Sequence, residues 1–436
     1  MDHAQHEHLA EELARRHVEE IVEWCRSRSE RSIVRPVETR SVGIIGAGLM
    51  GTAIAAANVK AGISVTLCDV EPAALAAAPV RIAAELAHQV ATGLPAPAKE
   101  VDRLVTVTSD LAGLGSCGLI IESVVEDLAA KRRLYFDLLP NIQSGAVLAS
   151  NTSTIPIRRL AAELPSADRF CGIHFFHPVR DRSLVEIIRG PSTSEATIAT
   201  AARYVRAIDK MPIVVEDGPG FLVNRLLVPY LTEALEMLLD GAAIGEIETA
   251  ATGFGMAMGP LRVVDEIGLD TTFRAGRVLW EAFPQRVVPS PLLVMLIKKG
   301  RLGRKTGAGF FAYPSQTSWE GPGDDDPDVE QFVAAWRRCG REFSAAEIVD
   351  RLLLPMVIEA SRLLEEGKVS DPRAIDLAVL FGLGFPPARG GLLYWADHLG
   401  VDQLMRRVEA LAPLGDRFHP TPLLLDMARR SAGFYS

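Results

Sequence analysis

Between residues 41 and 217 the chain alternates short apolar runs with amphipathic stretches of helical period. The first apolar run ends in a glycine-rich turn, a helical stretch follows it, and a second apolar run comes next, which is the order of a βαβ unit. Apolar runs that alternate with helices in this way predict a parallel sheet covered by helices, the α/β architecture. The runs are SVGIIG (41–46), ISVTLCD (63–69), LIIESVV (119–125), AVLASNT (146–152) and FCGIHFF (170–176).

Beyond Gly218 the strand patterns give way to long helical periodicities, and the sequence repeats itself. The segment NRLLVPYLTEA (224–234) recurs as DRLLLPMVIEA (350–360), and FGMAMGP (254–260) recurs as FGLGFPP (381–387). Two matches in the same order predict a duplicated helical unit. The segment GPGDDDPD between the copies has the composition of a solvated linker. We therefore expect all-α domains at 218–313 and 346–436, joined by a linker at 314–345.

The first 40 residues predict a docking helix followed by a linker. Apolar residues and one histidine recur there mostly every fourth position, which places them on one helical face before an Arg/Ser-rich stretch at 26–32. The face comprises Leu9, Leu13, His17, Ile21, Trp24 and Cys25.

Composition narrows the possible partners. With 48% apolar residues, 23% charged residues and a net charge of −9, the chain has the proportions of a soluble globular protein and not those of a nucleic-acid or anionic-membrane binder. The five cysteines lie far apart without a CxxC pair, so we expect no zinc site and no disulfide framework. The N-terminus is acidic and lacks the apolar stretch of a secretory signal, and the longest apolar stretch, around Thr52 to Leu67, is too short for a membrane span. These features favour a cytoplasmic protein that acts on small molecules.

The turn after the first apolar run carries the motif Gly46-Ala-Gly48-Leu49-Met50-Gly51. The first glycine permits a tight turn, the second lets backbone amides approach a pyrophosphate, and the third lets helix and strand pack closely. Asp69 ends the second run, where a carboxylate accepts hydrogen bonds from ribose hydroxyls and repels a 2′-phosphate. The alternative is a glycine turn and a solvated Asp without a nucleotide, which the complete βαβ context disfavours. We expect a Rossmann-type domain that binds NAD in preference to NADP.

Two polar residues, His174 in GIHFFHPV and Glu186 in SLVEIIRG, interrupt apolar surroundings. Oxidation of a hydroxyl needs a base with a pKa near neutrality, which histidine supplies, and a carboxylate can fix the imidazole tautomer and stabilise the imidazolium. A single histidine in an apolar run is more often a core residue, so the residues alone leave this pairing open.

From about Ser41 to the C-terminus the chain resembles the 3-hydroxyacyl-CoA dehydrogenases, in particular the dehydrogenase portion of the multifunctional fatty-acid oxidation alpha subunit. A series of segments in family order is far more specific than any single motif. The segments are VGIIGAGLMG, IIESVVEDLAAK, LASNTSTIPI, RFCGIHFFHPV, LVEIIRG, GPGFLVNRLLVPYLTEA, GPLRVVDEIGLD, GRKTGAGFF and GFPPARGG.

The resemblance implies roles for four residues. His174 corresponds to the family's catalytic base and Glu186 to its partner, while Ser153 and Asn224 correspond to residues that hold the reacting hydroxyl or carbonyl oxygen. Short polar side chains suit an oxygen that gains charge during the transfer. The alternative for Ser153 is a turn or cap serine, and the alternative for Asn224 is a helix N-cap.

Further residues match family positions at the nicotinamide cofactor. Glu126, Lys131 and Lys305 do so, although each could equally be an exposed charge. His177, which we also place at the cofactor, departs from the family: the motif commonly reads HFFNP, so a titratable ring replaces an amide and could change substrate scope or pH optimum. Asp350 stands where the second repeat would carry the catalytic Asn, which favours a structural role for that copy.

The resulting expectation is an oxidoreductase that converts (S)-3-hydroxyacyl-CoA and NAD⁺ to 3-oxoacyl-CoA and NADH in fatty-acid β-oxidation. Only about 40 residues precede the nucleotide fold, where the alpha subunit carries its hydratase, so hydratase chemistry is not expected. One alternative is an enzyme restricted to 3-hydroxybutyryl-CoA or another short 3-hydroxy acid. Another is a catalytically silent, NAD-binding scaffold that docks a thiolase-like partner, although a scaffold would not need all four catalytic-type residues.

The expected partners are an acyl-CoA thioester as substrate and a thiolase or hydratase as a protein partner. Single-copy members of the family, as the resemblance implies, pair their helical domains in homodimers. In this chain the second helical repeat could replace that partner.

Overall fold

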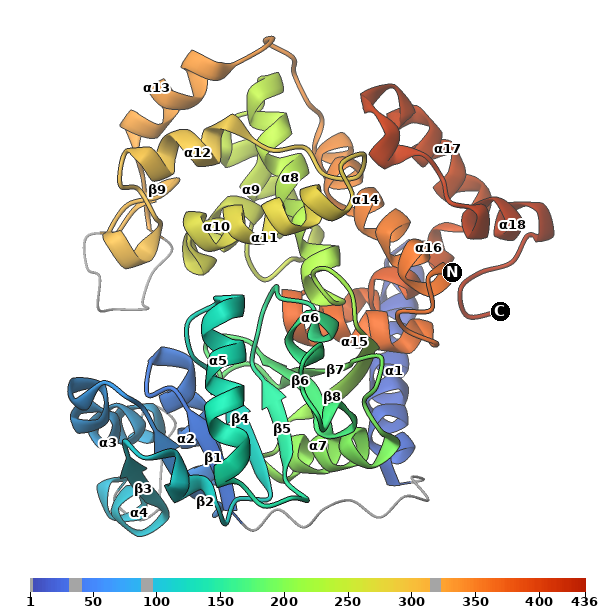
Figure 1. Cartoon of the computed structure of the whole chain (residues 1–436). Helices are drawn as coiled ribbons and strands as arrows, with labels where there is room; N and C mark the ends of the chain where they lie inside the picture. Colours follow the sequence, from blue (N-terminus) through green and yellow to red (C-terminus); the bar gives the residue numbers. More distant parts are fainter. Residues whose placement is uncertain (1–2, 31–40, 88–96, 314–322) are drawn as a thin grey trace. The chain divides into compact units, whose positions relative to one another are not determined.

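The computed structural model of the chain describes residues 3–30, 41–87, 97–313 and 323–436 (Figure 1). They form two compact units, Ile21–Phe221 and Met1–Glu20 with Leu222–Ser436. We refer to these as the nucleotide-fold unit and the helical unit.

The nucleotide-fold unit contains an eight-stranded sheet in the order β3-β2-β1-β4-β5-β6-β7-β8. The first six strands are parallel, and the chain order reverses direction between β1 and β4, as in Rossmann folds. β7 runs antiparallel to β6 and parallel to β8. The strands are β1 (Ser41–Ile45), β2 (Ser64–Cys68), β3 (Val105–Thr108), β4 (Leu119–Glu122), β5 (Val147–Ser150), β6 (Phe170–Phe175), β7 (Leu184–Arg189) and β8 (Met211–Glu216).

Helices cover this sheet, which confirms the expected Rossmann-type architecture. The central strands are buried along almost their whole length, because helices exclude water from both faces of a doubly wound sheet. The helices are α2 (Leu49–Lys60), α3 (Pro72–Ala87), α4 (Pro97–Leu104), α5 (Leu128–Leu138), α6 (Ile157–Ala161) and α7 (Glu195–Ala207), with 3₁₀ turns at Leu111–Leu114, Leu139–Asn141 and Ala167–Arg169.

The N-terminal helix α1 (His3–Glu30) continues into the Arg/Ser-rich stretch that we expected to be a linker. Ala14, His17, Ile21 and Cys25 are buried, so the predicted four-residue spacing identifies the packed face only in part. Leu13 is 39% exposed, although it belongs to the predicted face. Residues 31–40 lie outside the described part of the chain.

The helical unit contains the duplicated segments. Its first repeat comprises α8 (Val223–Asp240), α9 (Ile244–Phe254), α10 (Pro260–Ile267), α11 (Leu269–Ala282) and α12 (Pro291–Lys298), followed by a 3₁₀ turn at Arg304–Thr306. Its second comprises α14 (Ala345–Glu365), α15 (Pro372–Leu383), α16 (Leu392–Leu399), α17 (Val401–Leu411) and α18 (Pro422–Arg430), with 3₁₀ turns at Pro387–Arg389, Ala412–Leu414 and Asp416–Phe418.

The two repeats are related residue by residue where α8 packs along α14. Arg225 of α8 pairs with Glu359 of α14 and with Glu366, the C-cap of α14, and Arg351 of α14 pairs with Glu233 and Asp240 of α8. Each arginine and each acid of one helix has its counterpart 126 positions away in the other: 225 and 351, 233 and 359, 240 and 366. Such reciprocity is the property of an interface with two-fold symmetry.

The repeat also extends to the ends of the two copies. Asp265 of α10 accepts hydrogen bonds from the backbone N–H groups of Phe310 and Phe311, at 2.8 and 2.9 Å. Asp397 of α16 does the same for Phe434 and Tyr435, at 2.8 and 3.0 Å. The terminal AGFF and AGFY segments therefore belong to the duplication.

The segment predicted as a linker at 314–345 contains a helix, α13 (Pro327–Trp336), and the short strand β10 (Asp324–Asp325), which pairs with β9 (Phe311–Ala312). Asp326 caps α13 by accepting from the backbone N–H of Asp328, and Pro327 occupies the first helical position. The acidic segment that indicated a linker therefore also contains the residues that begin a helix, Asp326 and Pro327.

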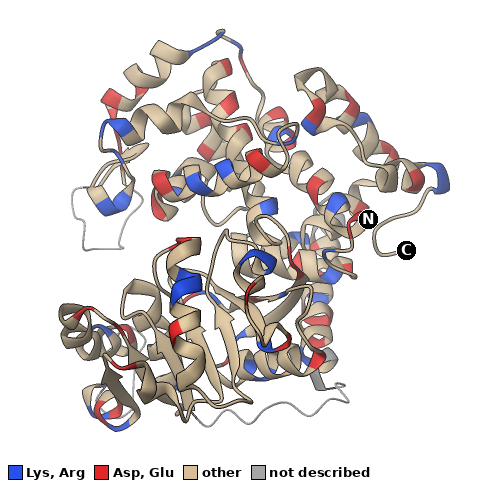
Figure 2. Ribbon diagram, in the orientation of Figure 1, with Lys and Arg blue, Asp and Glu red and all other residues tan. Residues whose placement is uncertain are grey.

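Charged residues belong mainly to the helices and loops, and few belong to the strands (Figure 2). None of the helices within the described ranges combines the length and the apolar character needed to cross a membrane.

Candidate active site

The glycine turn joins β1 to α2, and its backbone requires glycine. Gly46 has a φ of +107°, and a Cβ there would lie 2.5 Å from the carbonyl oxygen of Ser123. A Cβ on Gly51 would lie 1.8 Å from the carbonyl oxygen of Gly46. At Gly48, the N-cap of α2, a Cβ would meet no atom within 4 Å. This glycine therefore faces open space at a helix N-terminus, where a phosphate group fits.

Leu49 and Met50 form the first turn of α2, and Leu49 is 63% exposed. Asp69 follows β2 and reaches the same turn from the neighbouring strand. Its Oδ2 accepts a hydrogen bond from the backbone N–H of Ala47 at 2.6 Å, and its Oδ1 accepts one from the backbone N–H of Glu71 at 2.9 Å. The turn, the helix end and the carboxylate are the parts from which Rossmann folds build a dinucleotide site, so the residues present fit NAD.

His174 and Glu186 lie directly opposite each other on the antiparallel strands β6 and β7. His174 Nδ1 and Glu186 Oε2 are 2.7 Å apart, and the side chains are 6% and 0% exposed. A buried carboxylate is an acceptor only, so it favours the tautomer in which Nδ1 carries the proton and Nε2 can accept one. The structure thus brings together the pair whose association the residues alone left open.

Ser153 lies in the loop after β5, and Glu126 holds this loop. Glu126 Oε1 accepts from the backbone N–H groups of Ser153 and Thr154, both at 2.9 Å, and from Thr152 Oγ1 at 2.6 Å. Burial acts to raise the pKa of Glu126, but the charge of Lys131 and the hydrogen bonds from Thr152 and Thr154 lower this pKa below its ordinary value. Glu126 therefore stays ionised beside Ser153.

Lys131 is not an exposed charge. Its side chain is 1% exposed, and its ammonium lies 2.7 Å from Glu122 Oε1 and 3.3 Å from Glu126 Oε2. Glu122 is the last residue of β4 and is also fully buried. Sequence reasoning missed Glu122, although a carboxylate that ends the run Leu-Ile-Ile was a detectable signal.

Asn151 is a second residue that the sequence reasoning missed. Its Oδ1 accepts from the backbone N–H of Phe175 at 2.9 Å, and its Nδ2 donates to Ser123 Oγ at 3.2 Å. It therefore ties together the carboxyl ends of β4, β5 and β6. Its place directly after an apolar strand resembles that of Asp69.

His177 lies in the loop between β6 and β7, and burial lowers the pKa of its imidazole below the ordinary value. The loop is fixed by Lys210, whose ammonium donates to the carbonyl oxygens of Val179 and Arg182 at 2.6 and 2.7 Å. Arg180 of the loop pairs with Glu85 of α3. The placement of His177 at the cofactor stays a prediction.

Asn224 and Lys305 belong to the helical unit. Asn224 is half-buried in the first turn of α8, and Lys305 pairs with Asp270 of α11. Asp350, the counterpart of Asn224 in the second repeat, accepts from Arg407 at 3.0 Å, an ion pair within that repeat. The catalytic role of Asn224 and the cofactor contact of Lys305 stay predictions.

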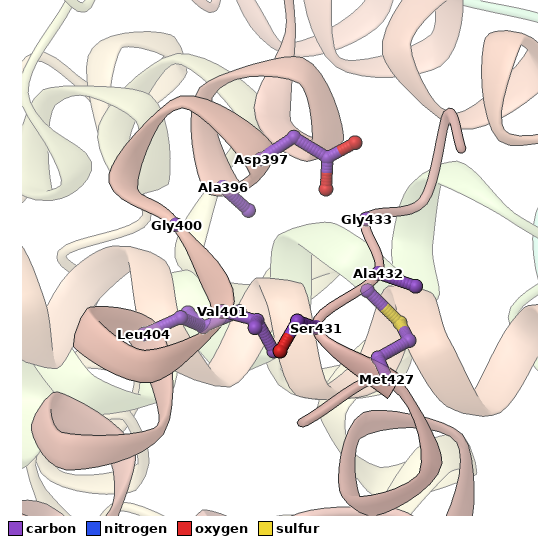
Figure 3. A pocket seen from close by; sticks show the side chains of 9 residues that line it. All are labelled: Ala396, Asp397, Gly400, Val401, Leu404, Met427, Ser431, Ala432 and Gly433. Carbon is purple, nitrogen blue, oxygen red and sulfur yellow. The ribbon is translucent and has the colours of Figure 1, made fainter. Parts of the chain in front are cut away.

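One small cavity of about 130 Å³ lies among α16, α17, α18 and the C-terminal residues (Figure 3). Leu404 and Met427 make it partly apolar, and its carboxylate, Asp397, is already bonded to backbone N–H groups. It contains none of the candidate residues. Within the described ranges, no group of three or more His, Cys, Asp or Glu side chains is arranged to hold a metal ion.

A glycine turn, an acidic residue after β2 and a buried His–Glu pair on a Rossmann sheet are the features expected of an NAD-dependent dehydrogenase. The family model described as the NAD-binding domain of 3-hydroxyacyl-CoA dehydrogenase matches residues 41–218. The model of the C-terminal domain of the same enzyme matches twice, at 220–313 and 348–432. The chain belongs to the 3-hydroxyacyl-CoA dehydrogenase family.

Solved structures show the same relationship. A 3-hydroxybutyryl-CoA dehydrogenase from Escherichia coli is 26% identical with a TM-score of 0.79, and the match covers 91% of this chain and 99% of that one. The dehydrogenase part of multifunctional enzyme 1 from C. elegans is 28% identical with a TM-score of 0.65, and the match covers 90% of each chain. An (S)-3-hydroxybutyryl-CoA dehydrogenase from Ralstonia eutropha is 34% identical with a TM-score of 0.60, and its whole length matches 64% of this chain.

Proposed function

We propose that this dehydrogenase converts (S)-3-hydroxyacyl-CoA and NAD⁺ to 3-oxoacyl-CoA and NADH, the oxidation step of fatty-acid β-oxidation, with His174 as the base. The observation that carries the assignment of the base is the buried contact of 2.7 Å between His174 Nδ1 and Glu186 Oε2.

In this mechanism His174 Nε2 takes the proton of the 3-hydroxyl group. Glu186 accepts a hydrogen bond from the Nδ1–H group of His174. This bond keeps the ring in the required tautomer and stabilises the imidazolium that forms. NAD⁺ supplies the chemistry of hydride acceptance when it is bound. Gly48, the amino end of α2 and Asp69 bind and orient the cofactor.

Two further residues hold the reacting oxygen in this proposal, Ser153 and Asn224. The oxygen gains carbonyl character during oxidation and alkoxide character in the reverse reaction, so a donor at a fixed position stabilises it. Four hydrogen bonds from the Ser153 loop to Glu126 Oε1 support a preorganised position for Ser153.

The test is NADH formation with 3-hydroxyacyl-CoA substrates that carry acyl chains of four, eight and sixteen carbons. We expect turnover of at least one of them, with NAD⁺ strongly preferred over NADP⁺. Activity with the four-carbon substrate alone would favour the second candidate, a 3-hydroxybutyryl-CoA dehydrogenase, which is the activity named for the E. coli and R. eutropha structures. NAD binding without turnover of any of these substrates would leave the scaffold and a dehydrogenase for a short hydroxy acid without CoA.

We also propose that the enzyme works in the cytoplasm and passes its product to a thiolase, or receives its substrate from a hydratase, in a complex. None of the five cysteines, all of which lie within the described ranges, forms a disulfide, which supports a reducing compartment. Co-purification with a tagged chain from its own cells, followed by thiolase and hydratase assays, tests the association.

A further inference from the structure

A buried carboxylate behind the candidate site lacks an explanation in the mechanism above. Glu122 ends β4 and is 0% exposed, yet each of its oxygens accepts two hydrogen bonds. Oε1 accepts from the backbone N–H of Val124 at 2.8 Å and from Lys131 at 2.7 Å. Oε2 accepts from the hydroxyls of Tyr135 at 2.6 Å and Ser150 at 2.8 Å.

Stability alone does not account for this arrangement. A buried ion pair is often no more stabilising than apolar side chains of the same volume, because both charges lose their hydration. The other residues of β4 are apolar and buried, so apolar side chains in place of the whole polar cluster would suit this environment as well. The ions are better explained by what they hold in place.

The contacts lead from Glu122 to the candidate site. The ammonium of Lys131 lies between the buried Glu122 and Glu126, whose side chain is 33% exposed. Glu126 in turn binds the backbone N–H groups of Ser153 and Thr154. The Ser153 loop follows β5 at the carboxyl edge of the parallel strands, the edge at which Rossmann folds bind their ligands.

We propose that Glu122 is a positioning residue of the dehydrogenase: it fixes Lys131, which fixes Glu126, which holds the Ser153 loop against the reacting oxygen and the nicotinamide end of the cofactor. This inference rests on the proposed function. Two carboxylates share one ammonium, so loss of the charge at 122 lets Lys131 move toward Glu126 and shifts the loop. Displacements of about 1 Å at a reacting centre reduce rates by up to about 100-fold.

The first test is Glu122→Gln, which keeps the size of the side chain, removes its charge and replaces one accepting oxygen with an amide nitrogen that donates. We expect kcat for 3-hydroxyacyl-CoA oxidation to fall by about 10- to 100-fold. The dissociation constant of NADH, measured by fluorescence titration, should change by less than about threefold, because the glycine turn and Asp69 are intact. A merely structural role would lower the melting temperature and leave kcat per folded molecule unchanged.

A matched pair of milder variants guards against misfolding. Tyr135→Phe removes one hydroxyl that donates to Glu122. Tyr204→Phe removes a hydroxyl that accepts from Asn58 at 2.9 Å, in α7 and away from the Ser153 loop. Both tyrosines are 0% exposed, so both variants lose one buried hydrogen bond. We expect kcat to fall by about three- to tenfold in Tyr135→Phe and to stay at the wild-type value in Tyr204→Phe.

The outcomes separate the two proposals. Wild-type kcat in Glu122→Gln, or wild-type kcat in both tyrosine variants, overturns the positioning role while the proposed function stands. An equal loss of kcat in both tyrosine variants also overturns it, since the effect would then be general. A wild-type protein that binds NADH but oxidises no 3-hydroxyacyl-CoA overturns the proposed function, and this inference with it.

Discussion

His174 owes its proposed role to the residue opposite it on β7, and a single substitution tests that role. Replacing His174 with Ala removes the proton acceptor, so we expect kcat to fall by about 10²- to 10⁴-fold, the range for losing a positioned general base. The glycine turn is untouched, so NADH should bind nearly as before in a fluorescence titration. Turnover within about threefold of wild type would exclude His174 from the mechanism.

Asp69 carries the prediction of cofactor preference. Asp69→Ala removes the ribose acceptor and the charge that repels a 2′-phosphate, and it also releases the N–H of Ala47 in the glycine turn. We expect weaker NAD⁺ binding and a smaller ratio of kcat/KM for NAD⁺ over NADP⁺. Asp110→Ala is the control, because Asp110 follows the neighbouring strand β3 and caps a 3₁₀ turn. Equal ratios in wild type and Asp69→Ala would show that Asp69 is not at the ribose.

At the residue scale, the sequence predicts which side chains are polar in apolar surroundings but not which of them contact each other. The types and positions of His174 and Glu186 were visible as polar residues in apolar runs, but their contact depends on strand register. The sequence is equally compatible with an exposed charge at Lys131. Its contacts with Glu122 and Glu126 form only when β4 and α5 pack together. A buried charge is recognisable only with its partners.

The short connection between β6 and β7 determines the direction of β7, which the pattern of apolar runs alone does not predict. Eight residues, 176–183, separate the two strands, and a parallel crossover needs a dozen or more. β7 therefore runs antiparallel to β6, in a sheet that was expected to be parallel. This reversal brings position 186 opposite position 174, so the connection length held information about the candidate site.

One contact between helices predicts a pH dependence of stability. Glu248 of α9 accepts a hydrogen bond from the backbone N–H of Leu261 at the start of α10, at 2.9 Å. Burial raises the pKa of Glu248 from its ordinary 4.5 to about 7. Between these values the folded chain binds the proton and the unfolded chain does not, so this group makes the folded state less stable as pH rises from about 4.5 to 7.

Glu248→Gln should remove that contribution, because the amide stays neutral throughout. In urea unfolding of wild type between pH 5 and pH 8 we expect a loss of up to about 2–3 kcal/mol from this group, and a correspondingly flatter profile in the variant. Parallel profiles for the two proteins would mean that Glu248 is ionised in the folded state across this range.

At the scale of the whole chain, the duplication was visible in the sequence, but its extent and its consequence were not. Two matched segments indicated the repeat, whereas the short AGFF and AGFY ends are recognised as part of it by the carboxylates of Asp265 and Asp397 that bind them. The reciprocal pairs of Arg225 and Arg351 likewise depend on how α8 lies along α14. A segment read as linker became α13, because the same acidic residues can cap a helix.

These reciprocal pairs support the prediction that the second repeat replaces a homodimer partner. A chain shortened to end at Tyr313 keeps α8 and loses α14, which leaves Glu233 without Arg351 and uncovers the apolar face of α8. An uncovered apolar face is unfavourable in water, so we expect the shortened chain to self-associate or lose activity. Light scattering and the NADH assay at several protein concentrations measure both effects, with the full chain as the control. The full chain should keep a concentration-independent specific activity, since its partner surface is linked covalently at high effective concentration. If the shortened chain stays soluble, monomeric and fully active, the second repeat is not a built-in partner.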